Sequence, residues 1–255
     1  MEPVYRSLEI AAHTLAAVQG IQLSVVDEHH VPSEGGAVIA VNHTGYVDFL
    51  PAALGVYRAG RRVRYMIKSE MMDVRVVRFL IEHTHTVPVD RSAGAEAYAT
   101  AVERLREGFL LGVYPEATIS RSFELKEFKT GAVRMAAEAD VPIVPCIVWG
   151  EQRLWSKGTS RRMGRHRIPV SVRFGTPLHV EPTADPGAET ERLKSVMSDL
   201  LDATRADYPE HPRGADWVPA AMGGSAPTLA EAHEIEVVEE REKAAARAAK
   251  RAENA

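Results

Sequence analysis

Residues 37–50 read AVIAVNHTGYVDFL, and this stretch decides the fold because it passes from a buried strand through a turn into a helix. The run Ala37–Val41 is apolar at every position, which is typical of a strand covered on both faces in a parallel sheet. Gly45 marks the turn, and Phe49 and Leu50 then open a segment with helical spacing. A strand that leads directly into a helix predicts an α/β domain.

Strand-like and helix-like segments alternate along the chain up to about residue 208. Short β-branched runs indicate strands, and longer runs with apolar residues three or four apart indicate helices. The predicted strands are Ile21–Val26, Ala37–Val41, Val63–Ile67, Thr84–Val89, Phe109–Tyr114, Pro142–Val148 and Ile168–Phe174. The predicted helices that follow the first turn are Val47–Tyr57, Glu70–Ile81, Ala95–Glu107, Gly131–Ala139 and Ala188–Asp207. This order predicts an α/β fold with a mixed, largely parallel sheet flanked by helices.

The composition is that of an ordinary globular protein. The 255 residues are 45% hydrophobic and 26% charged, with a formal net charge of -4, which excludes wholesale disorder and a polytopic membrane protein. The single Cys146 excludes an internal disulfide framework. No signal-peptide apolar region is present at the N-terminus, so we expect the protein to work in a reducing cytoplasm.

An amphipathic N-terminal helix is predicted within Val4–Ile21. Charged and polar residues interrupt this segment, so it falls short of the roughly 20 apolar residues that a transmembrane helix needs. Its apolar side would lie in lipid or pack on the domain, and packing is the usual arrangement. The residues that form this side are Leu8, Ala11, Leu15 and Val18.

The domain organisation follows from a change in composition after Tyr208. We expect a main domain over residues 1–208 and a Pro- and Gly-rich linker or wrap over 209–228. A charged helical tail is predicted over 229–255, with glutamates ahead of lysines and arginines. Its apolar stripe is thin, which favours a solvated helix over a partner-binding one.

Three of the ten histidines, His43, His85 and His211, are followed five positions later by an aspartate. His85 falls in a predicted strand, where an odd offset sends the two side chains to opposite faces. His211 lies in the linker, where nothing in the sequence holds a reactive geometry. His43 remains, because it stands at the carboxyl end of a strand, where open α/β sheets carry their sites.

His43 and Asp48 can meet only if the chain folds back at Gly45, since residues five apart on a continuous helix point about 140° away from each other. An aspartate that accepts the Nδ1 proton leaves Nε2 free as a general base. The alternative is structural: Asp48 caps the helix and His43 is a buried, hydrogen-bonded imidazole. The local sequence alone leaves these two interpretations about equal.

Nothing in the sequence supplies a nucleophile for such a base. No GxSxG elbow occurs, and Cys146 lies inside the apolar strand PIVPCIV, where a thiolate is disfavoured. A P-loop, a GxGxxG turn and an HExxH pair are absent, which argues against nucleotide and zinc sites. The pairs His29–His30 and His83–His85 have no third ligand at suitable spacing, so we expect no metal. The nucleophile then comes from the substrate.

Two further strand ends carry polar residues: VPVDRS ends one strand with Arg91, and YPEATIS follows the strand Phe109–Tyr114. These segments, with NHTGYVDFL, resemble the glycerophospholipid acyltransferases of the lysophosphatidic acid acyltransferase type. The resemblance covers about residues 37–148. NHTGYVDFL resembles the first motif of that family, with its His-x4-Asp dyad. The segment that begins at Lys68, KSEMMDVRVVRFLIEHTHTVPVDR, resembles the second motif, and YPEATIS resembles the third. FKTGAVRMA followed by VPIVP resembles the fourth motif and the element before it.

The resemblance implies a direct acyl transfer. A substrate hydroxyl, deprotonated by His43, attacks the thioester of acyl-CoA or of acyl carrier protein, and no acyl-enzyme or cofactor is involved. The expected acceptor is a glycerol-3-phosphate-type lipid, either lysophosphatidic acid or glycerol 3-phosphate, in phospholipid biosynthesis. Besides His43 and Asp48 as catalytic residues, the resemblance places six positions in acceptor binding: Lys68, Arg91, Glu116, Ala117, Thr118 and Lys129. An internal ion pair between Arg91 and Glu116 is the structural alternative for Glu116.

Two departures from the third motif affect the acceptor. Ala117 replaces a glycine and Ile119 replaces an arginine that the family associates with acceptor phosphate. Either Arg91, Arg121 and Lys68 suffice for the phosphate, or the acceptor is a different lipid hydroxyl, such as that of a glycolipid. A non-catalytic lipid-binding protein on the same fold is a third hypothesis. In each case we expect peripheral attachment to the cytoplasmic face of a membrane, through basic segments over residues 58–78 and 153–167.

Overall fold

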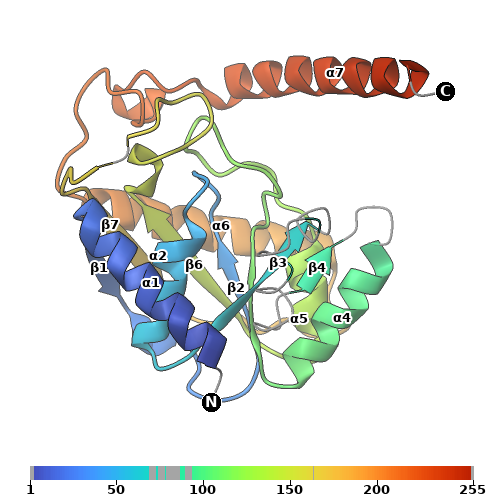
Figure 1. Cartoon of the computed structure of the whole chain (residues 1–255). Helices are drawn as coiled ribbons and strands as arrows, with labels where there is room; N and C mark the ends of the chain where they lie inside the picture. Colours follow the sequence, from blue (N-terminus) through green and yellow to red (C-terminus); the bar gives the residue numbers. More distant parts are fainter. Residues whose placement is uncertain are drawn as a thin grey trace.

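The computed structural model describes residues 3–68, 73, 78, 87–89, 94–162 and 164–253. Figure 1 shows a single sheet with helices packed around it and a long C-terminal helix beyond the loops at one end of the strands. Two predictions fall largely or partly outside the described residues. They are the helix over Glu70–Ile81, of which only residues 73 and 78 are described, and the start of the strand over Thr84–Val89, with His85.

The described part of the chain forms a seven-stranded sheet with the order β1-β7-β6-β2-β5-β3-β4. Neighbouring strands are parallel except β6 and β7, which are antiparallel, so the prediction of a mixed, largely parallel sheet is confirmed. The strands are β1 (Gln22–Val26), β2 (Ala37–Val41), β3 (Val63–Lys68), β4 (Val87–Val89), β5 (Leu110–Val113), β6 (Ile143–Trp149) and β7 (Pro169–Phe174).

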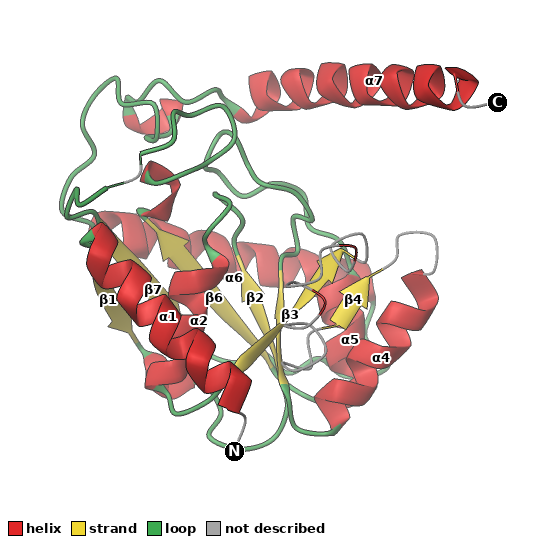
Figure 2. Ribbon diagram, in the orientation of Figure 1, coloured by secondary structure: helices red, strands yellow, loops and turns green. Residues whose placement is uncertain are grey.

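Helices cover both faces of this sheet (Figure 2). The α-helices are α1 (Pro3–Gln19), α2 (Phe49–Arg58), α4 (Gly94–Arg106), α5 (Gly131–Ala139), α6 (Pro186–Ala206) and α7 (Leu229–Glu253). Short 3-10 turns are η1 (Glu28–His30), η3 (Glu151–Arg153) and η4 (Ala220–Met222). The expected order of helices and strands is confirmed where the residues are described.

The central strand β2 explains why its sequence is apolar throughout. Its five residues are fully buried. Val38 and Ala40 face the side covered by α4, α5 and α6, whereas Ala37, Ile39 and Val41 face the side covered by α2. A strand with helices on both faces has no solvent side, so no polar residue alternates along it.

The N-terminal helix packs on the domain through a face other than the predicted one. Tyr5 donates a hydrogen bond to the carbonyl of Val63 at 2.6 Å, and Glu9 pairs with Arg62 at 2.7 Å. On the predicted apolar side, Leu8, Ala11 and Leu15 line an open cavity between α1 and α2, whereas Val18 is 66% exposed. None of the described helices has the length and apolar character needed to cross a membrane.

Part of the basic segment over residues 58–78 has structural partners. Arg61 donates to the carbonyl oxygens of Pro32, Gly35 and Gly108, and Arg62 pairs with Glu9 on α1. Arg64 is 3% exposed and stacks on the Tyr5 and Phe109 rings. These three arginines have partners within the domain, so the expectation that the whole segment over residues 58–78 serves membrane attachment is wrong for them.

The segment over residues 209–228 wraps against the domain. Trp217 and Val218 are buried and belong to the same apolar cluster as α4, α5 and α6. The guanidinium of Arg153 lies 4.4 Å from the centre of the Trp217 ring. Aromatic burial of this kind holds an irregular segment in place without regular secondary structure.

Candidate active site

His43 follows β2 directly, and its ring reaches Asp48 across the turn. His43 Nδ1 lies 2.8 Å from Asp48 Oδ2, and the same oxygen accepts hydrogen bonds from the backbone N–H groups of Thr44 and Gly45 at 3.2 Å each. Asp48 stands at the first position before α2, but its side chain makes no capping bond to that helix. The chain therefore folds back as the pairing requires, and the Asp48 carboxylate closes the turn.

The turn is tight because it packs against the segment after β6. A Cβ atom at position 45 would lie 2.5 Å from Glu151 Oε2 and 2.8 Å from the carbonyl oxygen of Trp155, so only glycine fits there. Thr44 donates to Glu151 at 3.1 Å, and Ser156 donates to the carbonyl of Thr44. Glu151 is fully buried, and burial followed by the Asp48 charge raises its pKa well above the usual range.

Tyr114, at the end of β5, makes a contact that the sequence analysis missed. Its ring stacks on the His43 imidazole with centroids 4.1 Å apart, and its hydroxyl donates to Asp48 Oδ1 at 2.7 Å. Burial, followed by the Asp48 charge, raises the pKa of Tyr114, so the phenol stays a donor. The signal was present in YPEATIS, because its tyrosine stands at the end of a strand next to the strand that carries His43.

Glu116 joins the loops that follow β2 and β5. It is 4% exposed, and its two carboxylate oxygens accept from the backbone N–H groups of His43 at 2.8 Å and Lys126 at 3.1 Å. The His43 carbonyl in turn accepts from the backbone of Ser120 at 2.7 Å. Burial raises the pKa of Glu116 to about 7, and the two backbone bonds oppose this rise. These bonds hold the backbone of His43 between two loops.

The rest of the third motif lies beside Glu116. Ala117 adopts a left-handed conformation with φ 60°, so it keeps the backbone shape for which the family uses glycine. Thr118 accepts a hydrogen bond from Lys126 Nζ at 2.7 Å. Ile119 is buried, 5% exposed, where the family has an arginine. Lys126 was not singled out in the sequence analysis, because it lies ten residues beyond Glu116 and outside the motif.

Of the remaining residues predicted to bind the acceptor, Lys129 is exposed, and the side chains of Lys68 and Arg91 lie outside the described part of the chain. Lys129 is exposed, and its backbone N–H donates to the carbonyl of Pro115 at 2.8 Å. Lys68 ends β3, but its side chain lies outside the described part of the chain. Arg91 also lies outside the described residues, and with it the predicted Arg91–Glu116 pair.

Two other histidines, His30 and His211, and the single cysteine have contacts of a structural kind. His211 Nε2 accepts a hydrogen bond from the Trp149 indole at 3.2 Å, and His30 Nδ1 lies 3.1 Å from the carbonyl of Phe174. Burial raises the pKa of the Cys146 thiol. Within the described residues, no group of three His, Cys, Asp or Glu side chains is arranged to hold a metal ion.

An apolar cavity of about 530 Å³ opens beside His43. It lies between α1 and α2, and its floor reaches Tyr65 and Tyr114 next to the dyad. Leu8, Leu15 and Ala53 contribute to walls that carry few polar groups. A long apolar group that enters this cavity would end close to the imidazole.

The chain is similar to several known acyltransferases. The family model described as acyltransferase matches residues 22–149. The 1-acyl-sn-glycerol-3-phosphate acyltransferase of Bacillus subtilis is 27% identical over 180 residues, covering 69% of this chain and 83% of that protein. The alpha form of that enzyme from Homo sapiens is 25% identical over 209 residues, covering 80% of this chain and 71% of that protein.

The fold also matches a solved structure, the 1-acyl-sn-glycerophosphate (LPA) acyltransferase PlsC from Thermotoga maritima. The TM-score is 0.68 at 20% sequence identity, over 80% of this chain and 81% of that chain. At this identity the likeness establishes the shared fold. The family model covers half of the sequence and includes the strand ends that carry His43, Asp48 and Glu116. The resemblance in the motifs is thereby confirmed, and the chain belongs to the acyltransferase family.

Proposed function

We propose that this O-acyltransferase moves a fatty acyl group from acyl-CoA or acyl carrier protein to a hydroxyl of a glycerol-3-phosphate-type lipid in phospholipid biosynthesis. The acceptor is lysophosphatidic acid or glycerol 3-phosphate. The names of the relatives from Bacillus subtilis and Homo sapiens support this acceptor class. The observation that carries the chemistry is the 2.8 Å contact between His43 Nδ1 and Asp48 Oδ2.

The contact assigns His43 as a general base. A carboxylate accepts, so Nδ1 carries the shared proton and Nε2 keeps a free lone pair. Nε2 takes the proton of the acceptor hydroxyl while the hydroxyl oxygen attacks the carbonyl carbon of the thioester. The C–S bond then breaks, and the leaving thiolate takes the proton back from the imidazolium. An imidazole can act as a base in the first step and as an acid in the second near neutral pH.

The apolar cavity supports the acyl part of the proposal. Its volume of about 530 Å³ and its weakly polar walls fit a fatty acyl chain better than a sugar or nucleotide. A chain that lies between α1 and α2 would bring its carbonyl end to His43, where Tyr114 also lines the cavity.

Replacement of His43 tests the mechanism. We expect His43→Ala to lower kcat for transfer from acyl-CoA to lysophosphatidic acid by about 10²- to 10⁴-fold, since a positioned general base contributes about that much. His233→Ala, at an exposed position on α7, is the matched control and should keep full activity. Near-normal turnover by a folded His43→Ala protein would refute the assignment of His43 as the base.

A second acceptor is favoured by one observation. Ile119 is buried where the family has an arginine associated with acceptor phosphate, so that cation is missing. A hydroxyl on a glycolipid would need no such cation. An acceptor screen with labelled acyl-CoA should show transfer to lysophosphatidic acid, and exclusive transfer to a phosphate-free lipid would select the second acceptor.

Peripheral attachment to a membrane is part of the proposal. Ile10 and Val18 on the outer side of α1 are 60% and 66% exposed. Gln19 at the end of α1 accepts from the backbone of Gly164, which joins this side to a loop of exposed arginines. Those arginines are Arg161, Arg162, Arg165 and Arg167.

Such a surface suits an anionic bilayer, because each well-placed cation adds about 1 kcal/mol. Binding to vesicles that contain phosphatidylglycerol should weaken as salt is raised. The charge reversal Arg165→Glu should weaken it further. Binding that is indifferent to salt but lost in Val18→Glu would assign attachment to α1 alone.

A further inference from the structure

The C-terminal helix α7 contacts the domain through charged residues instead of an apolar stripe. Ala232, Glu236 and Glu239, spaced four and three apart, form its inner side. Ile235 and Val238 face outward and are 41% and 52% exposed. A surface helix normally turns its apolar residues inward, so this orientation indicates that charge holds α7 in place.

The partners of these glutamates are cations of the loop that follows the third motif. Glu239 forms an ion pair with Arg121, and Glu236 Oε2 lies 2.6 Å from Lys126 Nζ. Lys157 is a third cation here: its pKa is lowered chiefly by burial, and its charge interacts with both glutamates and both cations. Arg121 is 12% and Lys126 21% exposed, so α7 partly covers them.

Of these cations, Lys126 contacts the third motif beside the active site. Lys126 Nζ donates to Thr118 Oγ1, and the Lys126 backbone donates to Glu116. Glu116 in turn accepts from the backbone of His43. Arg121 is one of the residues left for the acceptor phosphate once Ile119 replaces the family arginine. Two carboxylates of α7 therefore occupy cations that an anionic acceptor would meet.

We propose that α7 is a tethered competitor of the acceptor phosphate: Glu236 and Glu239 hold Lys126 and Arg121 until a lipid phosphate displaces them and releases the helix. The proposal rests on the proposed function in that the ligand is a phosphate-bearing lipid. Phosphate and carboxylate seek the same charge-assisted bonds, and a doubly charged phosphate is the stronger partner. Coupling is reciprocal, so whatever weakens the docking of α7 strengthens binding of the phosphate.

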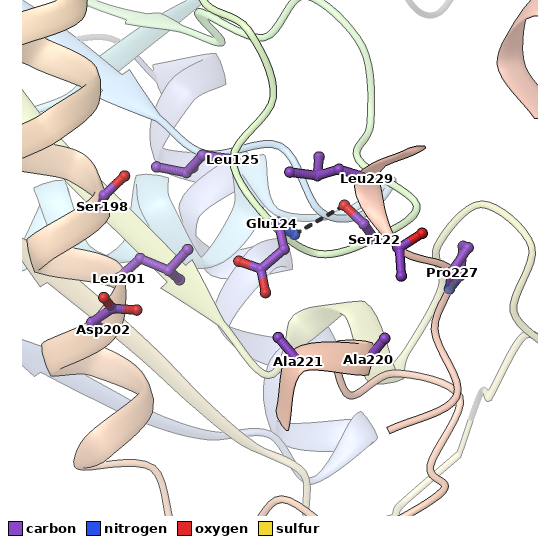
Figure 3. Close-up of a pocket in the computed structure, with 11 residues that line it drawn as sticks. Ser122, Glu124, Leu125, Ser198, Leu201, Asp202, Ala220, Ala221, Pro227 and Leu229 are labelled. Atoms are coloured by element: carbon purple, nitrogen blue, oxygen red, sulfur yellow. Dashed lines mark hydrogen bonds between the residues drawn. The ribbon is translucent and has the colours of Figure 1, made fainter. Parts of the chain in front are cut away.

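The root of α7 has little packing to resist such a movement. Figure 3 shows a pocket there, lined by Pro227 and Leu229 together with Ser122 and Glu124. The pocket has a volume of about 420 Å³. Leu229, the first residue of the helix, is 46% exposed. In Figure 1 the far end of α7 extends away from the sheet and its flanking helices.

The double variant Glu236→Gln/Glu239→Gln tests the competition, because it removes both charges and keeps both side chains similar in size. We expect its KM for lysophosphatidic acid to fall about five- to thirtyfold, with kcat little changed. The matched control is Glu234→Gln/Glu240→Gln, which removes the same charge from exposed positions of α7. An unchanged KM in the first variant, or an equal fall in the control, overturns the proposal.

A second measurement does not depend on turnover. Hydrogen exchange of residues 229–240 in the full-length His43→Ala protein should rise when lysophosphatidic acid is added. Monoacylglycerol, which has the same chain but no phosphate, should leave it unchanged. An equal response to both lipids, or to neither, contradicts the competition. If the wild-type protein transfers no acyl group, the proposed function fails, whereas the exchange result still decides whether α7 responds to phosphate.

Discussion

Asp48 is 1% exposed, and four donors converge on its carboxylate. One oxygen accepts from the His43 ring and from two backbone N–H groups of the turn, and the other accepts from the Tyr114 hydroxyl. A buried carboxylate needs such donors, because it has lost its water. The same bonds fix the orientation of the imidazole, so one set of contacts both stabilises the buried carboxylate and positions the His43 ring.

Tyr114→Phe removes one of these donors and keeps the aromatic ring against His43. We expect kcat to fall about three- to tenfold with KM little changed, because a buried oxygen of Asp48 loses a bond that contributes about 1 kcal/mol. The Tyr98→Phe variant is the control, since that hydroxyl bonds to an exposed Glu138 far from the dyad. Steady-state kinetics of both variants measures this effect, and an equal fall in kcat in the two variants would contradict the role of Tyr114.

Ala117→Gly is expected to stabilise the protein. Ala117 has φ 60°, and a left-handed conformation costs an L-residue roughly 1–2 kcal/mol. Glycine avoids this cost but loses about 0.4–1 kcal/mol through the entropy of the unfolded chain. The free energy of unfolding should therefore rise by about 0.5–1 kcal/mol in chemical denaturation. Ala53→Gly, within helix α2, should lower it, and a loss of stability in Ala117→Gly would contradict the strain.

At the scale of elements, the site depends on two neighbouring parallel strands. β2 and β5 pair in register, with Ala40 opposite Val113, so His43 and Glu116 leave the sheet at the same edge. The predicted strand ends were sufficient to place these two residues together. The face by which α1 packs was not predictable in this way, because it depends on the Glu9–Arg62 pair and on Tyr5, contacts that join distant parts of the chain.

The wrapped segment over residues 209–228 should contribute strongly to stability through Trp217, which is 3% exposed. We expect Trp217→Ala to lower the free energy of unfolding by about 3–5 kcal/mol, as for other buried aromatic residues. Trp155, which is half-buried, is the matched position, and its replacement by alanine should cost clearly less. If Trp217→Ala lowered the free energy of unfolding only slightly, as expected for an exposed residue, the segment would pack weakly.

At the scale of the whole molecule, Glu116 makes the free energy of unfolding depend on pH. Its pKa is about 7 in the folded protein against a usual 4.5, so the folded state holds the proton more tightly. Its contribution is complete below about pH 4.5 and is lost as the pH rises to about 7, a change of about 3 kcal/mol. Once Glu116 is ionised in the folded protein as well, a further rise in pH no longer changes its contribution to the free energy of unfolding.

Glu116→Gln cannot titrate and isolates this effect. The difference in the free energy of unfolding between the wild-type protein and this variant should shrink or change sign as the pH rises from about 4.5 to 7. Chemical denaturation at several pH values measures it, and other groups such as Glu151 cancel because both proteins contain them. A difference that stays constant across this range would contradict the raised pKa of Glu116.

The sequence by itself determined the α/β alternation, the burial of β2 on both faces, and the position of His43 at the end of a strand. These features follow from short-range periodicity and from the position of a residue at a strand end. Only the tertiary structure decided the partners: Tyr114 and Asp48 are 66 residues apart, Glu116 and His43 are 73 apart, and Lys126 and Glu236 are 110 apart. Side-chain contacts over such separations arise when packed elements bring distant strand ends, loops and helices together, and no local pattern records them.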